Sequence, residues 1–176
     1  MWEKTLRPVL ELMDHVEVSA DNFKCEGGYE LLFNGKDLTG WGYWNKKALT
    51  KIESFDGRST SSEGRYQAKH GFLVVTTTPE GRSFAQLWTS EEFDTDFTLK
   101  LEFRANANAD SGVFIRRPQL QCHDNSVAGP HEDLKSYKPG EWNEIIVVEK
   151  GRTARCTCNG EVLEEEFKPQ KAVRLD

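Results

Sequence analysis

Long apolar runs are missing from this sequence of 176 residues. A helix needs about 20 consecutive apolar residues to cross a bilayer, and no window of the chain approaches that length. The opening stretch, MWEKTLRPVLELMDHVEVSA, carries acidic side chains throughout and has no continuous apolar core, so it lacks the pattern of a signal peptide. We therefore expect no membrane span. Two locations fit this sequence: the cell interior, or the outside of the cell if the export signal has been removed.

Positive charge is also scarce. Lysine and arginine total 23 against 29 aspartates and glutamates, which gives a formal net charge of −6. The longest basic clusters are pairs, such as Lys46–Lys47 and Arg116–Arg117. Binding to a nucleic-acid backbone needs a basic patch, so we expect no nucleic-acid partner.

Cysteine is sparse, and its spacing is not that of a common zinc site. The four cysteines, at positions 25, 122, 156 and 158, contain no C-x-x-C pair. Cys156 and Cys158 lie two positions apart on a predicted strand, so both side chains point to one face and a bond between them is disfavoured. We expect free thiols, with one disulfide as the alternative.

The motifs of several enzyme classes are absent too. The chain has no G-x-S-x-G nucleophile turn, no phosphate-binding P-loop and no E-x-D-x-x-E strand of the retaining glucanases. We expect no organic cofactor.

Aromatic residues and strand periodicity are what the sequence does contain. Aromatics make up 11% of the chain and include five tryptophans, which suits stacking on ring-shaped ligands, although core packing is the alternative for each of them. From about residue 29 apolar positions recur with period two, cleanly so in DFTLKLEFRA, and turn signals follow about every 8 to 12 residues. We predict about nine strands in an all-β fold, an antiparallel sandwich or jelly roll.

The N-terminal segment follows a different pattern. Apolar side chains recur at helical spacing over residues 2–14, which predicts a short helix that Pro8 weakens. We therefore divide the chain into a helical appendage and loop at 1–27 and a β-sandwich domain at 28–176.

Local signals within the second part predict its first strands and turns. We expect a strand at 29–33 and a long polar loop at 45–64, which is rich in serine and glycine. Hairpin turns are predicted at His70–Gly71 and Asn159–Gly160, because an Asn-Gly pair supplies the positive φ angles of a type I′ turn.

Polar residues on the later strands define a candidate site. If these strands lie side by side, their polar positions form one surface with an acid, two guanidinium groups, two amides and an imidazole. The residues concerned are Glu102, Arg104, Arg116, Gln119, Gln121 and His123, with Asp124 at the strand end. Such a set can hold a polyhydroxylated ligand and move a proton. The alternative is that Glu102 and Arg104 only pair across strands on a solvated face.

Several segments together resemble a known family. The stretches GYELLFNGKDLTGW, DFTLKLEFR, DSGVFIR, QLQCHD and KPGEWNEIIVVEKG occur in an order that resembles the 3-keto-disaccharide hydrolase family, long known only as a domain of unknown function. The resemblance runs from about residue 28 to the end of the chain. It implies a concanavalin A-like jelly roll and a secreted or periplasmic location. It also implies cleavage of glycosides whose C3 hydroxyl has been oxidised to a ketone, with an oligosaccharide or glycoside as substrate.

This chemistry needs a base near C2, a positive group or metal at the C3 oxygen, and an acid for the leaving group. We expect His123 or Glu102 as the base, with Arg116 or a divalent cation, such as calcium, at the enolate. Asp124 is expected to be a metal ligand or the acid. The substrate-binding residues that we expect are Arg104, Gln119, Gln121, Trp41 and Trp142.

Two features depart from the family pattern. The family often has a glutamate where this chain has Gln119, which favours a non-catalytic carbohydrate-binding module as the alternative function. A protein-interaction domain of the laminin-G kind is a third alternative. The family's last strand has no counterpart in the ending KAVRLD, so we expect an open sheet edge that either pairs with a second copy in a homodimer or is covered by the N-terminal segment.

Overall fold

The structure is a computed structural model in which two compact units, Met1–Ser90 and Glu91–Asp176, each have their own sheets. It describes residues 25, 27–45, 50–77, 85–106, 109–115, 119–123, 134–151 and 153–167. For 45, 50–51, 110–111, 119–123 and 163–167 only the backbone is described. The helix predicted at 2–14 lies outside the described residues.

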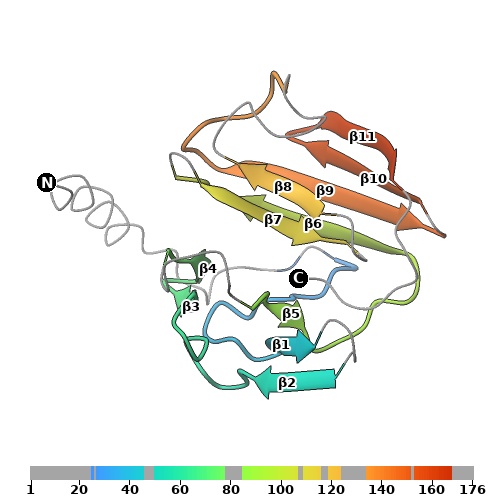
Figure 1. The fold of residues 1–176 in the computed structure, drawn as a ribbon. Coiled ribbons are helices and arrows are strands. Elements are labelled where there is room, and N and C mark those ends of the chain that lie inside the picture. Colours follow the sequence, from blue (N-terminus) through green and yellow to red (C-terminus); the bar gives the residue numbers. More distant parts are fainter. Residues whose placement is uncertain are drawn as a thin grey trace, which may run out of the picture. The chain divides into compact units, whose positions relative to one another are not determined.

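Every regular element of the described residues is a β-strand, and every strand pair is antiparallel, which confirms the predicted all-β class. The strands of the first unit are β1 (Trp41–Asn45), β2 (Thr50–Ser54), β3 (Tyr66–Lys69), β4 (Phe72–Val75) and β5 (Trp88–Thr89). Those of the second are β6 (Phe97–Phe103), β7 (Asp110–Phe114), β8 (Gln119–His123), β9 (Asn143–Lys150), β10 (Thr153–Cys158) and β11 (Glu161–Phe167) (Figure 1). Nowhere in the described ranges is there a helix with the length and apolar character needed to cross a membrane.

Two local predictions for the first unit are wrong. Residues 29–33, predicted as a strand, form none; the Leu32 carbonyl accepts a hydrogen bond from the Trp41 indole at 2.9 Å instead of joining a ladder. The polar loop predicted at 45–64 contains β2. Ile52 is an extra residue between the pairs that β2 makes with β1, and this bulge hides the period-two pattern.

Both predicted hairpin turns are confirmed. His70 and Gly71 have φ values of 52° and 79°, and they join β3 to β4. Asn159 and Gly160, with φ values of 48° and 82°, join β10 to β11. Two successive residues with positive φ match the right-handed twist of the strands that they connect.

The core of the first unit lies against the sheet β2-β1-β5. Leu38, Tyr43, Phe55 and Leu87 are buried there, and the Tyr43 and Phe55 rings meet edge to face with centroids 4.7 Å apart. Gly42 lets β1 and β2 approach closely, because a Cβ at this position would clash with the backbone carbonyl oxygen of Glu53.

The second unit has the more regular sheet, in the order β11-β10-β9-β6. Burial alternates along β9, where Ile145 and Val147 are buried and Glu144 is exposed. Cys156 and Cys158 are both buried as free thiols on β10, which confirms that they share a face. Cys25 is also free, while the side chain of Cys122 lies outside the described residues.

β7 and β8 form a separate two-stranded sheet in this unit. The single polar surface was predicted on the condition that these strands lie side by side, and this condition is met only in part. β7 pairs with β8, but β6 pairs with β9, which follows it by about 40 residues. Among the described residues β6 forms no ladder with β7 or β8.

Candidate functional site

The end of β6 and the start of β9 bring together three of the predicted site residues. The register pairs Glu102 with Glu144 and Phe103 with Asn143, so Arg104 and Trp142 come next to each other beyond the last pair. The Arg104 guanidinium carbon lies 5.4 Å from the centroid of the Trp142 ring. We call Glu102, Arg104, Trp142 and Glu144 the Trp142 face.

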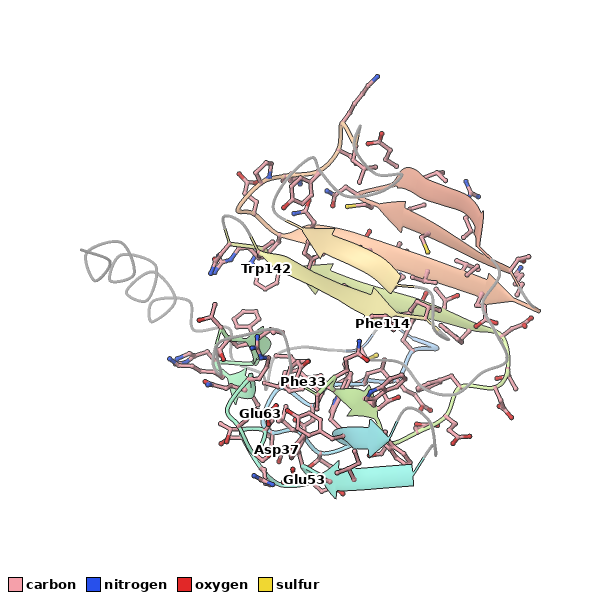
Figure 2. The ribbon with its side chains drawn as sticks, viewed as in Figure 1. Phe33, Asp37, Glu53, Glu63, Phe114 and Trp142 are labelled. Atoms are coloured by element: carbon pink, nitrogen blue, oxygen red, sulfur yellow. The ribbon has the colours of Figure 1, made fainter. Side chains whose placement is uncertain are left out.

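Trp142 has the character of a stacking platform. It is 40% exposed, which is unusual for so large an apolar side chain that has a fixed backbone (Figure 2). The Arg104 guanidinium over the ring is a cation–π contact, which restrains both side chains. Aromatic rings present a flat apolar surface on which a sugar ring can stack.

Two carboxylates stand beside this platform. Glu102 and Glu144 are both exposed and lie directly opposite each other across the ladder of β6 and β9. Neither carboxylate makes a hydrogen bond or an ion pair with a residue that the structure describes. They are therefore available to accept hydrogen bonds from a ligand.

Asn143 fixes the backbone next to Trp142. It is fully buried, and its Oδ1 accepts a hydrogen bond from the Lys138 backbone N–H at 2.8 Å. Its Nδ2 donates to the carbonyl oxygens of Lys138 and Glu141, both at 2.9 Å. A buried amide with all these partners holds the chain before the tryptophan in one conformation, because each broken bond would leave a polar group unpaired.

Asn159, in the turn between β10 and β11, continues this clamp. Its Oδ1 accepts from the Glu144 N–H and its own N–H donates to the Glu144 carbonyl, both at 2.9 Å. Its Nδ2 donates to the Asn143 Oδ1 at 2.9 Å and to the Ser136 carbonyl at 2.7 Å. One turn residue thus fixes the backbone of Glu144 on both sides.

The loop before Trp142 is also tied to β11. The backbone N–H of Ser136 donates to Glu161 Oε2 at 2.8 Å, and hydrogen bonds from Ser136 hold the pKa of the Glu161 carboxyl below its usual value. The Tyr137 ring stacks on the Phe103 ring with centroids 6.4 Å apart. The platform therefore rests on β6, β9 and β11 of one sheet.

The remaining predicted residues of this unit are placed by backbone alone or not at all. Gln119, Gln121 and His123 occupy alternate positions of β8, where the register sets them opposite Phe114, Gly112 and Asp110. Arg116 and Asp124 lie outside the described residues. Asp110, the first residue of β7, was not predicted as a site residue; the register that sets it opposite His123 is a property of the folded ladder.

Trp41 belongs to the other unit. Its indole N–H donates to the Leu32 carbonyl at 2.9 Å, and its ring packs against the buried core of Leu38 and Phe55. This geometry gives Trp41 a packing role, and its role as a sugar platform stays a prediction.

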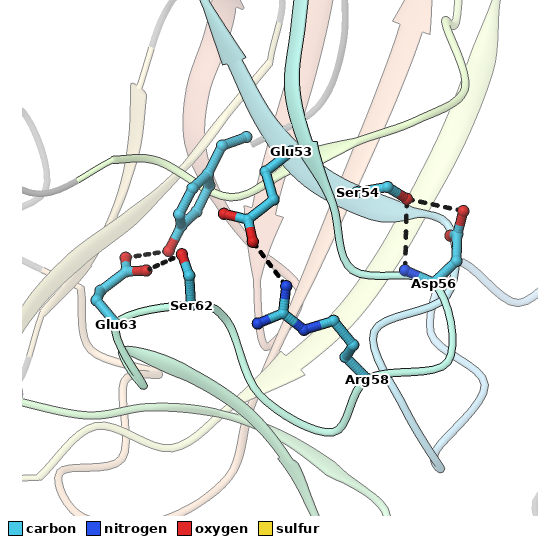
Figure 3. A network of polar contacts seen from close by, with 7 residues as sticks. Glu53, Ser54, Asp56, Arg58, Ser62 and Glu63 are labelled. Carbon is cyan, nitrogen blue, oxygen red and sulfur yellow. Dashed lines mark hydrogen bonds and ion pairs between the residues drawn. The ribbon is translucent and has the colours of Figure 1, made fainter.

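A second polar cluster, not found from the sequence, lies in the first unit (Figure 3). The Tyr43 hydroxyl donates to Glu63, and burial together with this bond raises the pKa of Tyr43. Glu53 forms an ion pair with Arg58 at 2.6 Å, and hydrogen bonds from Ser62 and Arg58 lower the pKa of Glu53. These groups hold one another, so the cluster stabilises β2 and the loop after it.

A divalent cation needs several donor side chains gathered around one point. In the ranges that the structure describes, no three histidine, cysteine, aspartate or glutamate side chains gather closely enough to hold a metal ion. The predicted ligand Asp124 lies outside these ranges.

The sequence from 28 to 175 matches the family described as the 3-keto-alpha-glucoside-1,2-lyase-like domain. The chain belongs to this family. The match covers the stretch in which the resemblance was found and confirms it. No protein of curated function matches the chain.

The structure of this chain is similar to the crystal structure of a candidate glycosyl hydrolase from Parabacteroides distasonis ATCC 8503. The two chains share 22% identity with a TM-score of 0.58, over 84% of this chain and 77% of the other. At this identity the likeness shows the fold, and it supports the antiparallel β-sandwich predicted from the periodicity.

Proposed function

We propose that the protein cleaves glycosides whose C3 hydroxyl has been oxidised to a ketone. The observation that carries the proposal is the Trp142 face: an exposed indole with a guanidinium on its ring stands next to exposed carboxylates, in a member of a 3-keto-glucoside lyase-like family. A sugar ring needs the stacking surface, and proton abstraction needs the base.

The C3 ketone makes the C2 proton acidic, and a base removes it to give an enolate. The enolate electrons then form the C1–C2 double bond while the bond from C1 to the leaving oxygen breaks, and that oxygen takes up a proton. Addition of water across the new double bond completes net hydrolysis. Each step conserves charge and needs no redox partner.

Glu102 is the base in this proposal, because it is an exposed carboxylate beside the platform. Trp142 stacks with the sugar ring, and Arg104 restrains the indole and donates to sugar oxygens. His123 is the other candidate base. Arg116 stabilises the enolate, and Asp124 is the acid. If a divalent cation binds, Asp124 would be its ligand and the cation would supply further positive charge at the enolate.

The test is release of 4-nitrophenol from 4-nitrophenyl 3-keto-glucosides of both anomers, with calcium, with EDTA and without protein. In D2O, deuterium should appear at C2 of recovered substrate if proton removal is reversible, so that the enolate takes up deuterium before the leaving group departs. Glu102→Gln should lower kcat by about 100-fold or more, the usual contribution of a general base. Glu141→Gln removes a nearby exposed carboxylate and should leave kcat unchanged. Wild-type rates in Glu102→Gln and His123→Ala would remove both residues from the mechanism.

The second candidate is a carbohydrate-binding module without catalysis, favoured by Gln119 at the position where the family often has a glutamate. It predicts that glucosides raise the melting temperature while no 3-keto-glucoside is turned over. Restoration of turnover in Gln119→Glu would assign the difference to this position. The absence of any sugar-induced thermal shift would instead favour a protein-interaction domain.

A further inference from the structure

Glu144 stands out in the ladder of β6 and β9. Among the residue pairs described for this ladder, Glu102 and Glu144 are the pair in which two charged side chains face each other. On the same face, Lys100 lies opposite Ile146 and Thr98 lies opposite Val148. Like charges directly opposite each other destabilise a sheet, so a solvated face with no other role would be better served by a neutral or basic residue at 144.

The position of Glu144 is fixed more firmly than a surface strand requires. Its N–H and its carbonyl both bond to Asn159, one to the side chain and one to the backbone. Asn159 holds the left-handed conformation, with φ at 48°, in which asparagine is one of the few residues tolerated. The carboxylate therefore extends from a rigid point of the sheet.

Its place relative to the platform is set by the pleat. Trp142 and Glu144 are two positions apart, so their side chains leave the same side of the strand. Glu102 on β6 and Arg104, which directly follows that strand, are likewise two positions apart, and both are exposed. A sugar stacked on the indole would thus have a carboxylate from each of two neighbouring strands at one end of its ring, where its hydroxyls project.

We propose that Glu144 is a substrate-contacting residue that determines specificity, by accepting hydrogen bonds from adjacent sugar hydroxyls together with Glu102. Asn159 is its positioning residue. The choice of a sugar as ligand rests on the proposed function. When the hydroxyls of a bound sugar ring donate hydrogen bonds to both carboxylates, these bonds offset the repulsion between the two negative charges.

The first test compares Glu144→Gln with Glu141→Gln, its matched control. The ligands are an unoxidised methyl glucoside and a deoxy analogue that lacks one ring hydroxyl. Their binding is measured by the change in Trp142 fluorescence, which is the part of the emission that Trp142→Phe removes. Glu144→Gln should weaken glucoside binding about tenfold, the loss expected for one charge-assisted hydrogen bond, and should bind the deoxy sugar like wild type. With the 3-keto-glucoside the same change should appear in KM, with kcat within about twofold.

The outcomes separate this inference from the proposed function. Selective binding by wild type without turnover of the keto sugar rejects the reaction and supports Glu144. If Glu144→Gln matches Glu141→Gln, or if wild type binds neither sugar, the role of Glu144 is refuted.

The second test concerns Asn159. Asn159→Gly keeps the positive φ but removes the amide, whereas Asn159→Asp keeps an oxygen to accept from Glu144. The glycine variant should lose glucoside affinity and make the Trp142 emission more readily quenched by iodide, and the aspartate variant should recover part of both. Unchanged quenching and affinity in Asn159→Gly would overturn the positioning role; the aspartate variant gives the same test if the glycine variant does not fold.

Discussion

The polar side chains of the first unit contrast with the two carboxylates beside Trp142 in the second unit. In the first unit, polar groups bond to one another or to backbone: Asn34 and Asp37 hold their own loop, and Asp56 caps the N–H of Gly40 at 2.9 Å. In the second unit, the carboxylates of Glu102 and Glu144 have no partner among the described residues. A side chain already satisfied by the fold has little left for a ligand, so polar groups of the first kind indicate structure and those of the second indicate function.

The supports differ as well. The loop around Asn34 relies on short-range bonds, in which Asn34 Oδ1 accepts the N–H groups of Lys36 and Asp37 at 2.8 and 2.9 Å. The Trp142 face depends on Asn159, whose side chain bonds to Ser136, Asn143 and Glu144 from a turn far away in the sequence. The first arrangement is set locally, and the second exists only in the folded sheet.

The largest effect should come from the core of the first unit. Phe55→Ala removes a fully buried ring and should lower the free energy of unfolding by about 4 kcal/mol. Ile52→Ala, at a side chain that is 64% exposed, should change it by less than about 0.5 kcal/mol. Urea denaturation measures both, and a loss at Phe55 no greater than that at Ile52 would contradict the assignment of this core.

The clamp of the second unit should be nearly as sensitive. Asn143→Ala removes a fully buried amide and leaves the part-buried backbone groups of Lys138 and Glu141 that it holds without their partner, which should cost about 3 kcal/mol. Asn106→Ala, at an exposed position, is the control. Calorimetry measures the stability, and equal melting temperatures for the two variants would show that the amide is dispensable.

Gly42 tests the close approach of β1 and β2. In Gly42→Ala the added methyl meets the Glu53 carbonyl, so the strands must shift, at a cost of about 2 kcal/mol. Gly27→Ala adds the same methyl where no atom lies within 4 Å. Denaturant midpoints should separate the two variants; coincident midpoints would mean that the bulge absorbs the methyl.

Trp41 in the first unit and Trp142 in the second compare a packing role with a ligand-binding role for the same type of residue. Trp41→Phe loses the hydrogen bond to Leu32 and should cost about 1 kcal/mol of stability with sugar affinity unchanged. Trp142→Ala should leave the melting temperature nearly unchanged and weaken sugar binding about tenfold, by loss of the stacking surface. Titration calorimetry and thermal melts distinguish the effects. A loss of sugar affinity in Trp41→Phe would restore Trp41 as a platform.

Acid should produce the smallest effect. Hydrogen bonds from Thr39 and Asn34 lower the pKa of Asp37, and those from Ser62 and Arg58 lower the pKa of Glu53. Because the folded pKa lies below the unfolded one, the stability is present above the ordinary pKa values of 3.8 and 4.5 and is lost as pH falls through the folded values. The melting temperature should therefore fall as the pH drops below about 5, less steeply in the Glu53→Gln, Asp37→Asn variant. An identical slope in the variant would exclude these two groups.

The predictable parts of the fold were those with a local cause. The hairpin turns at His70 and Asn159 follow from residue types that accept positive φ, and β6 follows from its clean alternation. The failures have causes that local patterns do not contain. The bulge at Ile52 breaks the alternation of β2, and the Leu32 carbonyl bonds to a side chain nine residues away.

The sequence by itself determined the all-β class, the turns, the family and the chemical types at the site, including Glu102, Arg104 and Trp142. Only the tertiary structure decided which of these residues meet. The pairing of β6 with β9 places Arg104 on Trp142 and Glu144 opposite Glu102, although the sequence order suggests that β6 should lie beside β7. Strand partners and register depend on the burial of whole faces, and the period of a single strand carries no information about its partner.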